Sequence, residues 1–129
     1  MIRILIVDDE PTIRSTIATM LRMENYEVTT ASYGREALDS VLVHGPDLII
    51  TDYNMPRMNG QQLLDAVRDI PCTATVPVLM LSGNTAVRPC PAGDAHTPTA
   101  YLIKPFTRAQ LLCVLDTLLN PLRPPVCSQ

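Results

Sequence analysis

Residues 4–9 read ILIVDD, four apolar residues followed at once by two aspartates. A short, unbroken apolar run rich in β-branched residues is typical of a strand that is covered on both faces. Pro11 then suits the first position of a helix, and apolar residues recur at helical spacing from Ile13 to Leu21. The opening of the chain therefore predicts a buried strand that ends in acidic residues and leads into an amphipathic helix.

The same unit of strand and helix recurs along the rest of the chain. Alternating strands and helices imply a parallel sheet with helices packed on both of its faces. Further apolar runs predict strands over residues 26–31, 48–50, 76–81 and 100–103.

Several helix boundaries are marked by the residues that cap them. A helix over residues 34–44 should end at Gly45, because glycine readily takes positive φ and Pro46 forbids continuation. Asn59 and Thr107 each precede a glutamine by three residues, which is the spacing of a capping box at a helix start. These signals predict one helix after the third strand and another after the fifth.

One segment breaks the alternation. Between the fourth and fifth predicted strands a helix is due, yet Pro89, Pro91 and Gly93 fall within five residues. A proline inside a helix costs about 3 kcal/mol, through a lost hydrogen-bond donor and a clash with the preceding turn. We therefore expect residues 86–96 to form no regular helix, which leaves the fourth helix of the fold degenerate.

Length and composition fit a single domain. The chain has 129 residues, of which 47% are hydrophobic and 18% charged, so disorder throughout is excluded. Residues 120–129 hold three prolines and predict a Pro-rich tail or the start of a linker, which leaves residues 1–119 as the domain. The net charge is -3 and the basic residues form no cluster, so we expect no direct contact with nucleic acid.

The cellular compartment is inferred from what the sequence does not contain. The apolar run at the N-terminus is too short to span a membrane or to form the core of a signal peptide. The four cysteines lie far apart and lack the spacing of a metal site, which favours reduced thiols. A cytoplasmic protein without membrane contact is expected.

Polar residues stand where the predicted strands end. Asp8-Asp9 follow the first strand, Asp52 the third, Ser82 the fourth and Lys104 the fifth. Ligands of parallel α/β sheets bind beyond the carboxyl ends of the strands, so we expect these side chains to converge.

The chemistry of this set points to phosphoryl transfer. Three neighbouring carboxylates repel one another, so they need a lysine and a hard divalent cation, and oxygen ligands suit Mg²⁺ or Mn²⁺. A carboxylate beside such an ion is a competent nucleophile toward phosphorus. The ammonium of Lys104 and the hydroxyl of Ser82 are suited to the charge on the phosphoryl oxygens.

The chain resembles the receiver domain of bacterial two-component response regulators. The matching stretches are residues 4–9 (ILIVDD), 52–60 (DYNMPRMNG), 81–83 (LSG) and 101–106 (YLIKPF), which together cover nearly the whole chain in order. The resemblance implies a doubly wound sheet of five parallel strands, in the order 2-1-3-4-5 with helices on both faces. It also implies a phosphoacceptor switch, in which a sensor histidine kinase, a phosphotransfer protein or a small phosphodonor phosphorylates the acceptor aspartate. The conformational change that follows would regulate an output domain or a separate target.

The resemblance also assigns a role to each site residue. Asp52 would accept the phosphoryl group. Mg²⁺ would be bound directly by Asp9, Asp52 and the backbone carbonyl of Asn54, and through water by Asp8.

The resemblance gives roles to four further residues. Lys104 would pair with it, Ser82 would close onto it, and Tyr101 would swing inward as the coupled rotamer. Pro105 would follow a cis peptide bond that directs the Lys104 backbone.

Three alternatives compete with this interpretation. A flavodoxin-like electron carrier needs a hydroxyl- and glycine-rich loop after its first strand, where this chain has acids that would repel a phosphate. A haloacid-dehalogenase-type phosphatase needs a second acid two residues after its nucleophile, where this chain has Asn54. We therefore expect no enzyme for outside substrates, only catalysis of the protein's own phosphorylation and slow dephosphorylation. The third alternative is a receiver-shaped interaction module that phosphorylation no longer controls.

Overall fold

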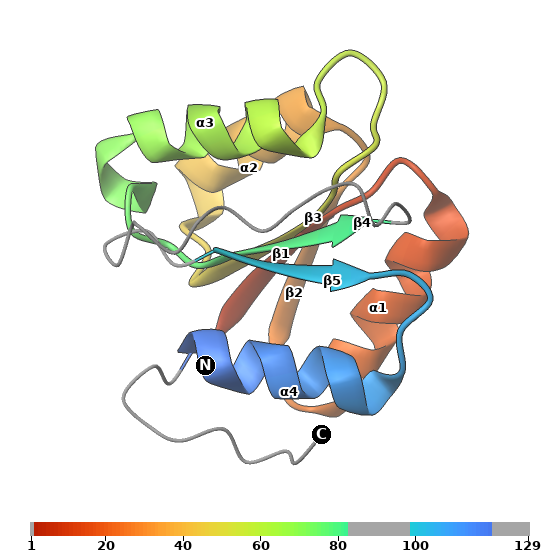
Figure 1. Ribbon diagram of the computed structural model, residues 1–129. Coiled ribbons are helices and arrows are strands. Elements are labelled where there is room, and N and C mark those ends of the chain that lie inside the picture. The colour runs from red at the N-terminus through yellow and green to blue at the C-terminus, as the bar shows by residue number, and fades with distance from the viewer. Residues whose placement is uncertain (1, 83–98, 120–129) are drawn as a thin grey trace.

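The computed structural model describes residues 2–82 and 99–119, drawn as a ribbon in Figure 1. Strands and helices alternate over residues 2–82, as predicted. The elements are β1 (Arg3–Val7), α1 (Pro11–Met23), β2 (Glu27–Ala31), α2 (Gly34–His44), β3 (Leu48–Asp52), α3 (Gly60–Asp69), a 3-10 helix η1 (Pro71–Thr73), β4 (Val78–Ser82), β5 (Thr99–Ile103) and α4 (Arg108–Leu119).

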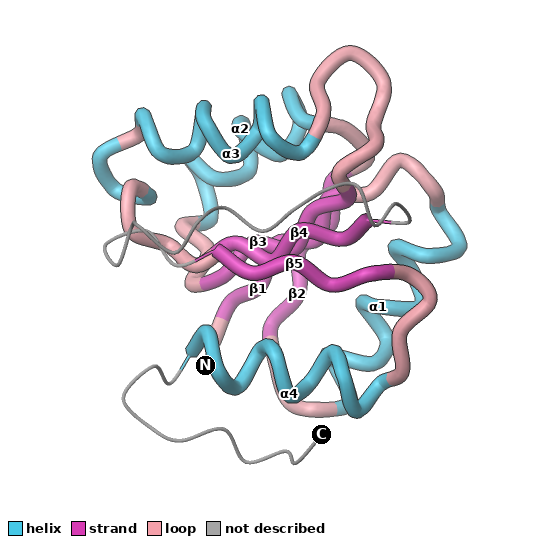
Figure 2. The backbone as a smooth tube through the Cα atoms, viewed as in Figure 1, coloured by secondary structure: helices cyan, strands magenta, loops and turns pink. Residues whose placement is uncertain are grey.

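The five strands form one parallel sheet in the order β2-β1-β3-β4-β5, which confirms the predicted topology. Helices α2 and α3 cover one face, and α1 and α4 cover the other (Figure 2). Near their carboxyl ends Val7 pairs with Thr51, and Asp52 pairs with Leu81. Because these pairs are in register, the carboxyl ends of β1, β3 and β4 lie at the same edge of the sheet.

The core consists of two apolar clusters, one on each face of the sheet. In β1, Ile4 and Ile6 join the cluster under α1 and α4, whereas Leu5 and Val7 join the cluster under α2 and α3. All four side chains are at most 1% exposed. Burying an aliphatic side chain contributes about 1.5–3 kcal/mol, which explains why the unbroken apolar run of residues 4–7 forms the central part of the sheet.

The predicted helix caps are present. Asn59 accepts a hydrogen bond from the Gln62 amide, and the Gln62 side chain accepts one from the Asn59 amide, at 2.8 and 2.9 Å. Thr107 and Gln110 exchange the same two bonds at 3.1 and 2.8 Å. Gly45 ends α2 with a φ of 55°, as the Gly-Pro pair predicted.

Some element boundaries differ from the expectation. The third and fourth strands extend to Asp52 and Ser82, beyond the apolar residues that marked them, and η1 was not predicted. The expected irregular segment over residues 86–96 and the tail over residues 120–129 lie outside the described residues.

The prediction that all the cysteines are reduced is wrong. Cys113 of α4 is disulfide-bonded, although its position in the sequence, far from the other cysteines, gave no sign of a pairing. None of the helices in residues 2–82 and 99–119 combines the length and apolar character needed to cross a membrane.

Candidate functional site

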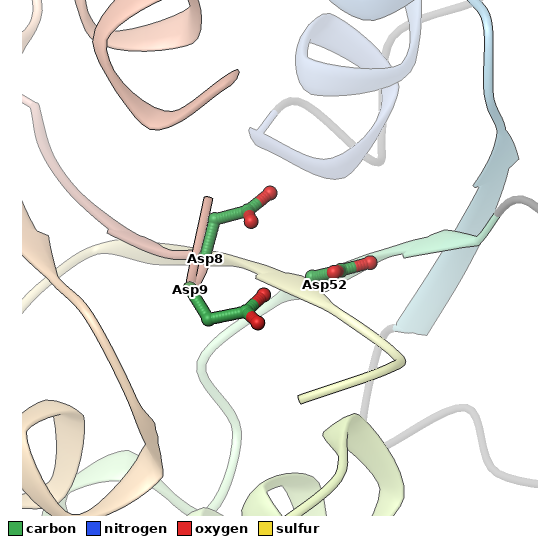
Figure 3. Close-up of side chains that lie close together, drawn as sticks. All are labelled: Asp8, Asp9 and Asp52. Atoms are coloured by element: carbon green, nitrogen blue, oxygen red, sulfur yellow. The ribbon is translucent and has the colours of Figure 1, made fainter. Parts of the chain in front are cut away.

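Three carboxylates meet at the carboxyl edge of the sheet (Figure 3). Asp8 and Asp9 directly follow β1, and Asp52 is the last residue of the neighbouring strand β3. One oxygen from each carboxylate lies within 4.8 Å of the other two. Asp8 is fully buried and Asp52 is 7% exposed, whereas Asp9 faces solvent. The convergence follows from the parallel register of β1 and β3.

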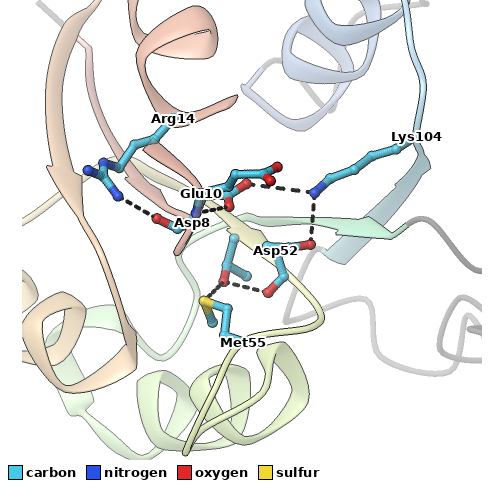
Figure 4. A network of polar contacts seen from close by, with 7 residues as sticks. Asp8, Glu10, Arg14, Asp52, Met55 and Lys104 are labelled. Carbon is cyan, nitrogen blue, oxygen red and sulfur yellow. Dashed lines mark hydrogen bonds and ion pairs between the residues drawn. The ribbon is translucent and has the colours of Figure 1, made fainter. Parts of the chain in front are cut away.

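Lys104 lies between two of these acids (Figure 4). Its Nζ is 3.1 Å from Asp52 Oδ1 and 3.7 Å from Asp8 Oδ2. The residue directly follows β5, and its backbone amide donates to the Ser82 carbonyl at 2.7 Å. The peptide bond to Pro105 is cis. One ammonium thus partly offsets the charge of two buried carboxylates.

Burial dominates the electrostatics of Asp8. Burial raises the pKa of Asp8 above its ordinary value, and the nearby Asp52 and Asp9 charges add to this. A hydrogen bond at 2.9 Å from the Glu10 amide to Asp8 Oδ1, together with the Lys104 charge, lowers the pKa in part. The other oxygen, Oδ2, is buried and has no hydrogen-bond partner among the described residues. A buried carboxylate oxygen without a hydrogen-bond donor is suited to bind a cation, or a water molecule that a cation holds.

The backbone after Asp52 is held close to the start of α3. The Gly60 amide donates to the Tyr53 carbonyl at 2.8 Å. A Cβ on Gly60 would stand 2.9 Å from both the Asp52 carbonyl oxygen and the Tyr53 Cα, and would also strike the Met80 sulfur. Arg57, in the same loop, has a φ of 70°. The tight approach of α3 to β3 therefore fixes the loop that follows Asp52.

The other predicted site residues lie on adjoining strands and loops. Ser82 is buried at the end of β4, one residue beyond the Leu81 that pairs with Asp52. Tyr101 is half-buried in β5 and packs against the cluster under α2 and α3. Asn54 is exposed in the loop after β3. The structure thus gathers Asp8, Asp9, Asp52 and Lys104 directly, with Ser82 at the next strand end.

Arg14 is a neighbour of the site that sequence reasoning missed. Its Nη1 donates a 2.7 Å hydrogen bond to the Asp8 backbone carbonyl. The sequence offered one sign of this contact: an arginine stands in the first turn of a helix, where the helix dipole favours acidic residues instead.

A groove beside the site was also missed, because it forms between segments far apart in the sequence. It has a volume of about 450 Å³ and opens next to Lys104. Its lining comes from α1 and from the loop after β5: Thr12, Ile13, Thr16, Ile17, Met20, Lys104, Pro105 and Phe106.

Comparison with known proteins identifies the family. Residues 4–116 match the family model of the response regulator receiver domain. The chain belongs to this family. The five-stranded parallel sheet in the order 2-1-3-4-5 is the receiver fold that the sequence predicted.

Individual relatives agree with the family assignment. An uncharacterized response regulatory protein of Staphylococcus epidermidis is 38% identical over 125 residues, which cover 95% of this chain and 48% of that protein. The chain thus spans about half the length of the curated relatives it matches.

Two solved structures share the fold of this receiver domain. The chemotaxis protein CheY4 of Vibrio cholerae superimposes with a TM-score of 0.84 at 39% identity, covering 92% of this chain and 99% of that one. The response regulator TrrA of Thermotoga maritima, solved in complex with Mg²⁺-BeF, has a TM-score of 0.79 at 31% identity, covering 92% of this chain and 100% of that one.

Proposed function

We propose that this receiver domain is a phosphoacceptor switch in which Asp52 takes a phosphoryl group from a sensor histidine kinase, a phosphotransfer protein or a small phosphodonor. The resulting change in conformation regulates an output domain or a separate target. The observation that carries the proposal is the buried Asp52 carboxylate, 3.1 Å from Lys104 Nζ and beside two further acids.

Mg²⁺, or Mn²⁺ in its place, is the cofactor of the proposed reaction. Its fit is supported by three carboxylates within 4.8 Å of one another and by the buried Asp8 oxygen that lacks a hydrogen-bond partner. In our assignment Asp9, Asp52 and the Asn54 carbonyl bind the ion directly, and Asp8 acts through water. When bound, the ion neutralises negative charge on the acids and on the phosphoryl oxygens. The TrrA structure in complex with Mg²⁺-BeF supports this choice of metal.

The residues of the chain supply the rest of the reaction. An Asp52 carboxylate oxygen forms a bond to phosphorus while the bond between phosphorus and the donor breaks, which gives an acyl phosphate. Lys104 stabilises the charge on the transferred group, and the Ser82 hydroxyl then closes onto it. Tyr101 moves inward in response. We propose no turnover of outside substrates, because Asn54 stands where a phosphatase of the aspartyl type would need an acid.

The partners follow from the same site. The groove beside Lys104 is mostly apolar and lies next to the acceptor, so we expect a protein phosphodonor to contact it. The longer relatives favour an output module elsewhere in the protein, which would act in the cytoplasm without membrane contact.

Beryllofluoride binding tests the switch, because this anion adds to a carboxylate as a stable mimic of a phosphoryl group. With Mg²⁺ present, wild-type NMR spectra should change around Ser82 and Tyr101. The Asp52→Asn protein should show no change, whereas Asp69→Asn, which alters an exposed acid at the end of α3, should behave like wild type. Wild-type spectra that stay unchanged would favour the alternative, a receiver-shaped interaction module that phosphorylation does not control.

A further inference from the structure

The turn after β1 is fixed at three points on Asp8. The Asp8 amide donates to the Ala31 carbonyl at 3.1 Å, and Asp8 Oδ1 accepts from the Glu10 amide at 2.9 Å. The third bond runs from Arg14 Nη1 to the Asp8 carbonyl oxygen at 2.7 Å (Figure 4). Of these three contacts, only the Arg14 bond is made by a side chain from outside the turn.

The acceptor of that bond belongs to the peptide unit that joins Asp8 to Asp9. Because a peptide unit is planar, holding its carbonyl oxygen also holds the Asp9 nitrogen and Cα, the atom from which the Asp9 side chain leaves the backbone. Asp9 faces solvent, and its carboxylate makes no hydrogen bond or ion pair within residues 2–82 and 99–119. Its position therefore depends on the backbone that Arg14 holds.

Helix stability does not account for an arginine at this place. Arg14 is the fourth residue of α1, and the first turn of a helix favours acidic side chains over basic ones. Helix α1 has no side-chain cap and no acidic residue in its first turn to compensate. Arg14 is also half-buried, so a long charged side chain is partly removed from water for a single hydrogen bond.

We propose that Arg14 is a positioning residue for the metal site: it holds the Asp8–Asp9 peptide so that the Asp9 carboxylate points at the ion. This inference rests on the proposed magnesium site. It concerns a residue that touches neither the ion nor the phosphoryl group.

The direction in which Mg²⁺ affinity changes when Arg14 is replaced distinguishes a positioning role from an effect of its charge. Arg14 is cationic, so its charge alone repels a divalent ion, and removing it would strengthen binding. Loss of positioning would weaken binding instead. The choice of ion gives a second criterion, because Mg²⁺ demands near-ideal octahedral geometry whereas Ca²⁺ accepts flexible coordination. A misdirected Asp9 should therefore weaken Mg²⁺ binding more than Ca²⁺ binding.

The experiment is calorimetric titration of the full chain with Mg²⁺ and separately with Ca²⁺. Arg14→Met keeps the apolar stem but loses the donors, and Arg14→Lys keeps the charge and one donor group. Arg22→Ala, in the exposed last turn of the same helix, is the matched control. Thermal unfolding of each variant without metal establishes that it is folded.

Arg14→Met should weaken Mg²⁺ binding roughly three- to tenfold, the effect expected of one hydrogen bond, and Ca²⁺ binding less than about twofold. Arg14→Lys should recover part of the loss, and Arg22→Ala should match wild type. Unchanged or tighter Mg²⁺ binding by Arg14→Met, or equal losses for the two ions, overturns the inference. If Arg14→Met does not fold, the same criteria apply to Arg14→Lys. Wild-type protein that binds no Mg²⁺ overturns the proposed metal site itself.

Discussion

At the scale of single residues, the site is a balance between burial and charge. Asp8 is fully buried, yet Lys104, the cation that pairs with its carboxylate among the described residues, is shared with Asp52. Removing one partner of a buried ion pair lowers the free energy of unfolding, because the other charge is left unpaired. A buried charge that is only partly offset also lowers it. In the metal-free protein, the partly offset charge of Asp8 is therefore expected to lower the free energy of unfolding.

Asp8→Asn should stabilise the metal-free protein at pH 7, by on the order of 1 kcal/mol. The pKa of Asp8 is raised in the folded state, so ionising it disfavours folding. The penalty appears as pH rises past the unfolded value of 3.8 and is complete above the raised folded pKa. Urea unfolding in EDTA at several pH values checks this. The gap between variant and wild type should close as pH falls, and a gap that widens toward acid would contradict the prediction.

Asp9→Asn should weaken Mg²⁺ binding about tenfold more than Asp8→Asn, because a direct ligand costs more to lose than one acting through water. Titration of both variants with Mg²⁺ decides between the two roles. Equal losses would mean that the roles of the two acids are wrongly assigned.

At the scale of secondary-structure elements, the sequence predicted most of the sheet and the caps. The strands were recognisable because both faces are buried, as the alternation of Ile4 and Leu5 between the two clusters shows. Their polar last residues, Asp52 and Ser82, carried no apolar signal, so the predicted third and fourth strands ended too early. The convergence of the acids followed from parallel topology. The hydrogen bond from Arg14 to the Asp8 carbonyl could not be predicted in this way, because it depends on how α1 packs against the turn that precedes it.

Gly60→Ala should destabilise the domain by about 1–3 kcal/mol, because its Cβ would press on the backbone at Asp52 and Tyr53. Gly34→Ala is the matched control, since Gly34 also begins a helix and the three atoms nearest to its added Cβ all belong to the flexible Met58 side chain rather than to backbone. We expect Gly34→Ala to have the smaller cost in urea unfolding. A larger cost for Gly34→Ala would show that the approach of α3 to β3 is not as constrained as described.

At the scale of the whole molecule, the described residues, 2–82 and 99–119, form a receiver fold. The domain matches receivers over residues 4–116, but the chain covers about half of its curated relatives. The convergence of Asp8, Asp9, Asp52 and Lys104 could be predicted from the sequence, because these residues lie at strand ends. The output could not, because it depends on surfaces and modules that local sequence patterns do not specify.

Residues 86–96 are predicted to form no regular helix, with or without phosphorylation. A continuous helix through Pro89 and Pro91 would cost several kcal/mol, roughly 3 for each proline, which is comparable to the stability of a small domain. Hydrogen exchange should find fast amides across this segment in both states. Strong protection over two consecutive turns would mean that the fourth helix forms after all.

The central claim is that Asp52 accepts a phosphoryl group in a reaction that needs a divalent ion. Intact-mass measurement after incubation with acetyl phosphate tests it most directly, on wild type, Asp52→Asn and the control Asp69→Asn, each with Mg²⁺ and with EDTA. Wild type and Asp69→Asn should gain one phosphoryl group with Mg²⁺ and little with EDTA, and Asp52→Asn should gain none. Stoichiometric phosphorylation of Asp52→Asn, or wild-type protein that stays unmodified in Mg²⁺, would contradict the account.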